Sequence, residues 1–127
     1  MNPSPETVVQ RQLDAYNAKD LAALLGIYAD DAELLEFPST LLARGSAALR
    51  ERFAQRFTEP HLHATLLSRI TVGDLVIDHE RVTRTFPEGP GTLELVMLYE
   101  VKAGRITRAW TKAGTKTLIA LPAPRPH

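Results

Sequence analysis

The hydrophobic periodicity of this sequence changes at Pro60, and the change separates a helical part from a strand part. Up to Phe57 the apolar residues recur every three or four positions, whereas beyond Pro60 they alternate almost to the end of the chain. The strand-like runs of the second part are residues 61–72, 75–86, 92–102 and 105–113. Because short turn signals join them, these runs predict a four-stranded antiparallel meander.

The helical part begins at Ser4, which is expected to cap a helix that continues to Asn17. Asp20 is expected to cap a second, short helix, which the pair Asp30-Asp31 ends. A strand over residues 32–37 follows, and the proline after it closes the strand because proline cannot donate a ladder hydrogen bond. These signals place two helices before the first strand.

A third helix follows Gly45, with Ser46 as its expected cap. The arginines of its segment LRERFAQRF are assigned to a solvated face. The order helix, helix, strand, helix, four strands indicates an α+β fold, in which three N-terminal helices cover one face of a strongly curved antiparallel sheet. We expect one cone-shaped domain over residues 1–117 with an interior pocket, and a proline-rich, loose or partner-bound tail over residues 118–127.

Charge and composition limit the classes of partner. The fifteen basic and fifteen acidic residues cancel, and neither sign forms a long run, so no nucleic-acid or acidic-membrane footprint is expected. The sequence has no cysteine, which excludes disulfides and thiolate chemistry. The start MNPSPETVV has neither the basic nor the apolar segment of a signal peptide, and no apolar run is long enough to span a bilayer. We therefore expect a cytoplasmic protein.

Three segments resemble the nuclear transport factor 2-like fold, and within it the SnoaL-like and ketosteroid isomerase-like proteins. They are VVQRQLDAYNAKDLAALLGIYADDAELLEFP, RGSAALRERF and GRITRAWTK, and the resemblance runs over residues 7–114. It implies the cone-shaped fold, a small-molecule pocket and a cofactor-free homodimer. The family includes isomerases, cyclases, epoxide hydrolases, dehydratases and proteins without catalysis, so the reaction must be argued from the site.

Carrying the family's catalytic positions over to this sequence gives one match and two departures. The resemblance places Glu36 at the carboxylate base of the ketosteroid isomerases. Gln12 falls where those enzymes have a tyrosine, and Met97 falls where they have a protonated aspartic acid. Losing one such donor commonly costs on the order of a hundredfold in rate. Tyr16, one helical turn beyond Gln12, is a candidate replacement donor or a core aromatic.

The predicted strand 75–86 has two faces. The resemblance places Ile77, His79, Arg81 and Thr83 inside the pocket, and the opposite assignment would place them at a dimer surface. Inside, His79 would relay a proton or donate to a ligand, and its alternative is a structural role. Arg81 would clamp an anionic ligand or neutralise Glu36. Arg81 also matches the arginine of limonene-epoxide hydrolases, but the flanking acids fall on Thr83 and Thr111, so water activation is not expected.

The remaining predictions concern metals and the outer sheet face. His61 and His63 share a strand face but have no third ligand at a convincing spacing, so no metal site is expected. Val82, Leu98 and Val101 are assigned to the outer face, which would form a large exposed patch unless two sheets pair in a homodimer.

Three hypotheses of function follow. In the first, Glu36 removes a proton next to a carbonyl of a small, largely apolar ligand, with His79 or Tyr16 as donor and Arg81, Thr83, Met97 and Tyr99 lining the pocket. In the second, Glu36 and Arg81 form a buried pair in a binding protein without turnover. In the third, Leu95, Met97 and Tyr99 fill the cone, and the protein only associates through its sheet.

Overall fold

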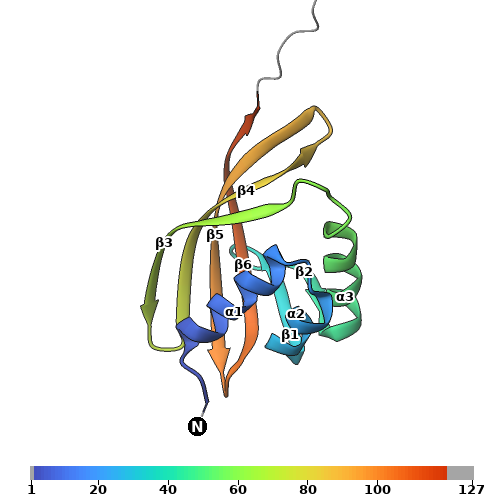
Figure 1. Ribbon diagram of the computed structural model, residues 1–127. Helices are drawn as coiled ribbons and strands as arrows, with labels where there is room; N and C mark the ends of the chain where they lie inside the picture. The colour runs from blue at the N-terminus through green and yellow to red at the C-terminus, as the bar shows by residue number, and fades with distance from the viewer. Residues whose placement is uncertain (1, 120–127) are drawn as a thin grey trace, which may run out of the picture.

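The computed structural model describes residues 2–119, which form three helices and six strands (Figure 1). The elements in chain order are α1 (Pro5–Asn17), α2 (Leu21–Ile27), β1 (Tyr28–Glu36), β2 (Thr40–Arg44), α3 (Gly45–Arg56), β3 (His63–Val72), β4 (Leu75–Phe86), β5 (Gly89–Lys102) and β6 (Arg105–Leu118). The predicted α+β fold is confirmed, with helices first and a meander after them. The predicted tail falls mainly on residues 120–127, which lie outside the described residues.

The six strands form one curved, open sheet in the order β2-β1-β6-β5-β4-β3 (Figure 1). The strands β3 to β6 pair as the predicted antiparallel meander. β1 joins the sheet beside β6, and this pairing is parallel. The sheet is therefore mixed, whereas the sequence predicts antiparallel pairing throughout. In Figure 1 the helices lie against one part of the sheet, and the upper ends of β4, β5 and β6 reach beyond them.

Two local predictions around β2 are wrong. Residues 40–44 form an edge strand that pairs with β1, whereas the sequence analysis predicts no strand between the proline after residue 37 and Gly45. The segment is only five residues long, and its apolar residues are consecutive, so it shows no alternation. Ser46 does not cap α3: the N-cap is Arg44, without a side-chain bond, and Ser46 Oγ donates to the carbonyl of Asp30 over 3.4 Å. Gly45 (φ 84°) makes the tight turn from β2 into the helix.

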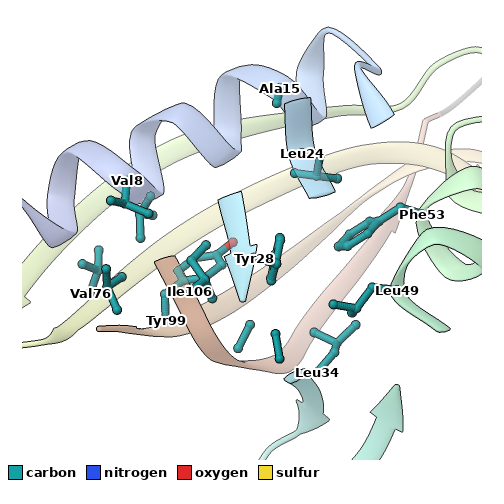
Figure 2. Close-up of a cluster of buried hydrophobic side chains, with 14 of the residues drawn as sticks. Val8, Ala15, Leu24, Tyr28, Leu34, Leu49, Phe53, Val76, Tyr99 and Ile106 are labelled. Carbon is teal, nitrogen blue, oxygen red and sulfur yellow. The ribbon is translucent and has the colours of Figure 1, made fainter. Parts of the chain in front are cut away.

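The predicted caps of the first two helices are confirmed, and both helices are held against the sheet. The side chain of Ser4 accepts from the amide of Thr7, and that of Asp20 accepts from the amide of Ala23. Figure 2 shows α1 crossing the strands, with Val8 directed towards Val76 and the Tyr99 region. These residues belong to the main buried cluster, which also contains residues of α2, α3 and β6. Amphipathic helices therefore close the concave face of the sheet.

Two polar contacts hold α1 to β3 and β4. Asn17, at the end of α1, donates from Nδ2 to the carbonyl of Ala64 (2.9 Å) and accepts at Oδ1 from the Ala64 amide (2.8 Å). Nearer the start of α1, Arg69 makes a bidentate pair with the fully buried Asp78 (2.6 and 2.9 Å) and donates to Gln10 (2.9 Å). The hydrogen bond with Asp78 raises the pKa of Arg69. Both contacts satisfy polar groups that burial would otherwise penalise.

The convex face of the sheet carries one apolar side chain from each strand, aligned in register. The pairs Ile70–Ile77, Ile77–Leu98, Leu98–Trp110, Trp110–Leu35 and Leu35–Leu41 are direct cross-strand neighbours. We call these six residues the outer row. Ile70 and Leu41, at its two ends, are 59% and 46% exposed. Of the residues predicted on this face, Leu98 belongs to the row, but Val82 and Val101 are buried beneath the helices.

None of the helices formed by residues 2–119 combines the length and the apolar character needed to cross a bilayer.

Candidate functional site

The concave side of the sheet contains a cavity of about 270 Å³, lined by residues of α1, α3 and all six strands. Ligand pockets commonly range from roughly 300 to 1,000 Å³, so the cavity suits a compact molecule. Its lining is mainly apolar, with Leu13, Leu34, Leu42, Phe53, Ala64, Val82, Leu93, Leu95, Met97 and Ala113. The hypothesis of a cone filled by Leu95, Met97 and Tyr99 predicts no such space.

Glu80 is the buried carboxyl group of the cavity. It lies on the inner face of β4 and is only 4% exposed. Among residues 2–119, no hydrogen-bond donor reaches its Oε2. Burial, reinforced by the charge of Asp78 and opposed by Arg69, raises the pKa of Glu80 to about 8. At neutral pH this side chain is therefore mostly a carboxylic acid, which is able to donate a hydrogen bond.

Hydroxyl and amide groups surround Glu80. Gln12 Nε2 lies 3.4 Å from Tyr28 Oη, and Tyr99 Oη donates to Gln12 Oε1 over 3.3 Å. Burial raises the pKa of Tyr99 well above its usual value and that of Tyr16 to about 12. These phenols therefore remain donors over the whole physiological range. Although Gln12 replaces the tyrosine of the ketosteroid isomerases, this part of the cavity is still polar. Its polar groups come from Gln12 on α1, Tyr28 on β1 and Tyr99 on β5.

Three arginines line another part of the cavity: Arg52 and Arg56 from α3, and Arg84 from β4. Burial and mutual repulsion lower the pKa values of Arg52 and Arg84. Glu59 is their nearest carboxylate, 3.9 Å from Arg56 Nη1 and 3.6 Å from Arg84 Nη2. The sequence analysis assigns the arginines of α3 to a solvated face. Arg52 is exposed as predicted, although it also lines the cavity, whereas Arg56 is partly buried.

Four of the seven predicted site residues line the cavity, namely Tyr16, Glu36, Met97 and Tyr99. Glu36 stands at the end of β1, exposed to solvent, and no ion pair between described residues includes it. Tyr16 packs edge-on against Phe57, with ring centroids 5.6 Å apart. The catalytic and binding roles of these residues stay predictions.

His79, Arg81 and Thr83 lie on the opposite face of the sheet, so the predicted face of β4 is wrong. In the register of β4 with β5, Met97 faces Asp78 and Tyr99 faces Val76. Paired residues share a face, so the inner set of β4 is Val76, Asp78, Glu80, Val82 and Arg84. His79 Nε2 instead lies 2.5 Å from Glu94 Oε1 on the convex face.

The turn between β4 and β5 is shorter than the sequence analysis predicts, and its length decides which face of β4 is inside. The sequence analysis places a long turn through Gly91, but Phe86 pairs with Gly89, so only Pro87 and Glu88 connect the strands. A turn that short fixes the register, and a shift of one residue exchanges the two faces of a strand. Requiring Met97 and Tyr99 inside, with a two-residue turn, would have placed Glu80 and Arg84 inside as well.

Metal ligands do not gather at this site or elsewhere among the described residues. Within residues 2–119, no group of three or more His, Asp or Glu side chains is arranged to hold a metal ion. His61 and His63 are both exposed. The chemistry available in the cavity is therefore that of carboxyl, phenol, amide and guanidinium groups.

Similar solved structures share this architecture. An uncharacterised cystatin-fold protein from Novosphingobium aromaticivorans superposes with a TM-score of 0.80 at 22% identity, over 87% of this chain and 99% of that chain. A hypothetical protein with a ketosteroid isomerase-like fold from Catenulispora acidiphila, in complex with trimethylamine, gives a TM-score of 0.73 at 17% identity, over 87% of this chain and 86% of that chain. Both likenesses concern the fold alone.

A protein from Sinorhizobium meliloti, to which polyketide cyclase activity is ascribed, superposes with a TM-score of 0.69 at 26% identity, over 84% of this chain and 94% of that chain. No curated protein matches the sequence at a significant level. The family model of the SnoaL-like domain matches residues 9–109, which is most of the chain. Because this match covers most of the chain, the chain belongs to the SnoaL-like domain family.

Proposed function

We propose that this protein binds a small, largely apolar carbonyl compound and moves a proton on the carbon next to the carbonyl, as in an isomerisation or a cyclisation. The observation that carries the proposal is the buried Glu80 carboxyl group, which lines the cavity and has an Oε2 without a partner among the described residues. With a pKa of about 8, this group holds its proton at neutral pH. It is therefore suited to donate a hydrogen bond to a ligand oxygen.

In the proposed reaction, Glu36 acts as the general base at the exposed end of the cavity. Its carboxylate takes a proton from the carbon beside the carbonyl. The electron pair of that C–H bond forms a carbon–carbon double bond, and the π electrons of the carbonyl move onto its oxygen. Glu80 stabilises the resulting enolate by donating a hydrogen bond to that oxygen, and Tyr16 is the second candidate donor. In an isomerisation, Glu36 returns the proton at another carbon. In a cyclisation, the enolate carbon attacks a second carbonyl carbon of the same molecule, the π electrons of that carbonyl move onto its oxygen, and this oxygen takes the proton that Glu36 holds.

Two features support a carbonyl ligand. The Glu80 carboxylic acid and the Tyr16 phenol, which both line the cavity, are hydrogen-bond donors at neutral pH, and a carbonyl oxygen only accepts. The rest of the lining is apolar, which favours a hydrocarbon skeleton around that oxygen. The fold of the Catenulispora acidiphila protein and the activity ascribed to the Sinorhizobium meliloti protein are compatible with such chemistry.

Binding without turnover is the second candidate function. Glu36 is exposed, and no donor or cation among the described residues fixes its orientation. A base that must be positioned within hydrogen-bond distance of a C–H proton would benefit from such a partner. The buried Glu36–Arg81 pair predicted for a binding protein does not form, because Arg81 lies on the convex face. The two candidates therefore differ in whether proton exchange occurs.

The test measures deuterium exchange next to the carbonyl, by NMR in deuterated buffer, with cyclohex-3-enone and a β,γ-unsaturated ketosteroid as substrates. Ultraviolet absorption at the same time records formation of the conjugated enone. We expect Glu36→Gln to reduce both rates by about 10²- to 10⁴-fold. Glu80→Leu, which removes the donor, should reduce them by about a hundredfold. Glu51→Gln, an exposed change on α3, should leave both rates unaltered.

Equal rates in wild type and Glu36→Gln would remove Glu36 from the reaction. Binding of the ketones without any exchange would favour the second candidate function.

A further inference from the structure

The three cavity arginines are incompletely neutralised. Among the described residues, Glu59 is the only carboxylate in an ion pair with any of them, and its two contacts of 3.9 and 3.6 Å are longer than good hydrogen bonds. Arg52 has no ion pair within residues 2–119. The Nε of Arg84 and the Oε2 of Glu59 are buried without hydrogen-bond partners in the same part of the chain.

The charge balance of this part of the cavity favours an anion. Three guanidinium groups face two carboxylates, Glu59 beside them and Glu36 elsewhere in the lining, while Glu80 is mostly neutral. A guanidinium group has five N–H donors arranged to hold a carboxylate or a phosphate. Bringing three such groups together costs free energy because they repel one another, and a bound anion would relieve that repulsion.

The arginines and Glu80 occupy opposite ends of the same surface. Arg84 and Glu80 are both on the inner face of β4, four residues apart, which corresponds to roughly 13 Å along an extended strand. The charges of Arg56 and Arg84 act on Tyr16. The charges that act on Glu80 are instead those of Asp78 and Arg69. Tyr16 therefore lies between a cationic end of the cavity and a carboxylic-acid end.

We propose that Arg52, Arg56 and Arg84 form an anion subsite, and that the ligand is a small keto acid whose carboxylate binds this subsite while its carbonyl reaches Glu80. The second half of this inference rests on the proposed function, whereas the anion subsite itself does not. A carboxylate is preferred to a phosphate because most of the cavity is apolar and compact, so the ligand is a small organic skeleton with one charged end.

The experiment compares probes that differ only in charge. 4-Oxo-4-phenylbutanoate and its methyl ester are titrated into the full chain at pH 7, and the affinities are measured from amide chemical shifts of cavity residues. Phenyl phosphate serves as a third probe. We expect the acid to bind at least about tenfold more tightly than the ester, because charge-assisted hydrogen bonds are the stronger kind. Phenyl phosphate should bind more weakly than the acid.

Variants of single residues test which arginines cause the preference for the acid over the ester. Arg52→Gln and Arg84→Gln should each reduce the acid-to-ester ratio towards one, and Arg52→Gln removes no ion pair between described residues. Arg50→Gln is the matched control, since Arg50 is on the same helix and exposed like Arg52, but lies outside the cavity lining. It should keep the wild-type ratio. Glu80→Leu should weaken acid and ester by the same factor, so that the ratio does not change.

The outcomes separate the subsite from the proposed reaction. Equal affinity for acid and ester in wild type, failure to bind either, or an equal loss of preference in Arg50→Gln would overturn the anion subsite. None of these results affects proton exchange in neutral ketones, which tests the reaction independently. Tighter binding of phenyl phosphate than of the acid would overturn the assignment to a keto acid.

Discussion

Glu80 makes the stability of this protein depend on pH. Its carboxyl group has a pKa of about 8 in the folded chain and the ordinary value of 4.5 in the unfolded chain, chiefly because folding buries it. Between these values the folded state holds a proton that the unfolded state has lost. The contribution of this group to stability is therefore fully present below about pH 4.5 and is lost as the pH rises through about 8.

We predict that the free energy of unfolding falls between pH 5 and pH 8 by up to about 1.4 kcal/mol per pH unit through Glu80. Urea denaturation at pH 5, 6, 7 and 8 measures this slope in wild type, in Glu80→Gln and in the exposed control Glu51→Gln. Glu80→Gln should lack the fall in the free energy of unfolding that is due to Glu80, and Glu51→Gln should show it. Parallel pH dependences of wild type and Glu80→Gln would show that Glu80 is ionised in the folded protein at neutral pH.

Single residues were also where sequence reasoning was weakest. The resemblance places Glu36 in the cavity lining, and helical spacing from Gln12 places Tyr16 there. The predicted face of β4 puts Glu80 and Arg84 outside the pocket, whereas both line the cavity. Their side chains are charged, and charged residues are seldom buried, so local pattern alone favours an exposed position. Only the register of a neighbouring strand places them correctly.

At the scale of elements, Asn17 attaches the end of α1 to the start of β3. Its amide satisfies both the N–H and the C=O of Ala64, as a strand neighbour would. We predict that Asn17→Ala lowers the free energy of unfolding by about 2 kcal/mol, because it leaves two partly buried backbone groups without partners. Chemical denaturation measures the loss. Gln55→Ala, an exposed change on α3, should alter stability by less than about 0.5 kcal/mol.

An unaltered stability in Asn17→Ala would mean that water replaces both hydrogen bonds at no cost.

The elements themselves were predictable to different degrees. The helix caps at Ser4 and Asp20 and the bounds of β4 follow from local signals, because the deciding contacts lie within a few residues. β2 does not, because it is an edge strand with few residues and no alternation. The parallel position of β1 beside β6 depends on contacts between distant segments, and no local pattern encodes it.

For the whole molecule, we propose a homodimer through the outer row. The row crosses all six strands, and its ends at Ile70 and Leu41 are exposed. Rows of charge flank it, including the Glu33–Arg44 and Glu33–Arg108 pairs on one side and the His79–Glu94 pair on the other. An apolar centre with a charged rim is the usual composition of a protein interface.

We predict that the wild type is a dimer and that Ile77→Lys is a monomer, because the change buries an unpaired charge at the centre of the interface. Light scattering after size-exclusion chromatography measures the molar mass of each. Ala54→Lys introduces the same charge on the exposed face of α3 and should remain a dimer. A monomeric wild type, or a dimeric Ile77→Lys variant, would contradict an interface at the outer row.

The parallel pairing of β1 with β6 also determines when the domain is able to fold. Glu33 and its hydrogen-bonded partner Arg108 are 75 positions apart, so β1 and β2 leave the ribosome long before the strand that connects them to the meander. Until β6 emerges, α3 and the β1–β2 hairpin have no sheet to cover, and their apolar faces stay in contact with water or with chaperones. Closing so long a loop is a slow and late step. A nascent chain stopped before Arg105 would contain the β1–β2 hairpin and the strands β3 to β5, but not the strand that joins them. The domain therefore folds as one unit only after β6 has been made.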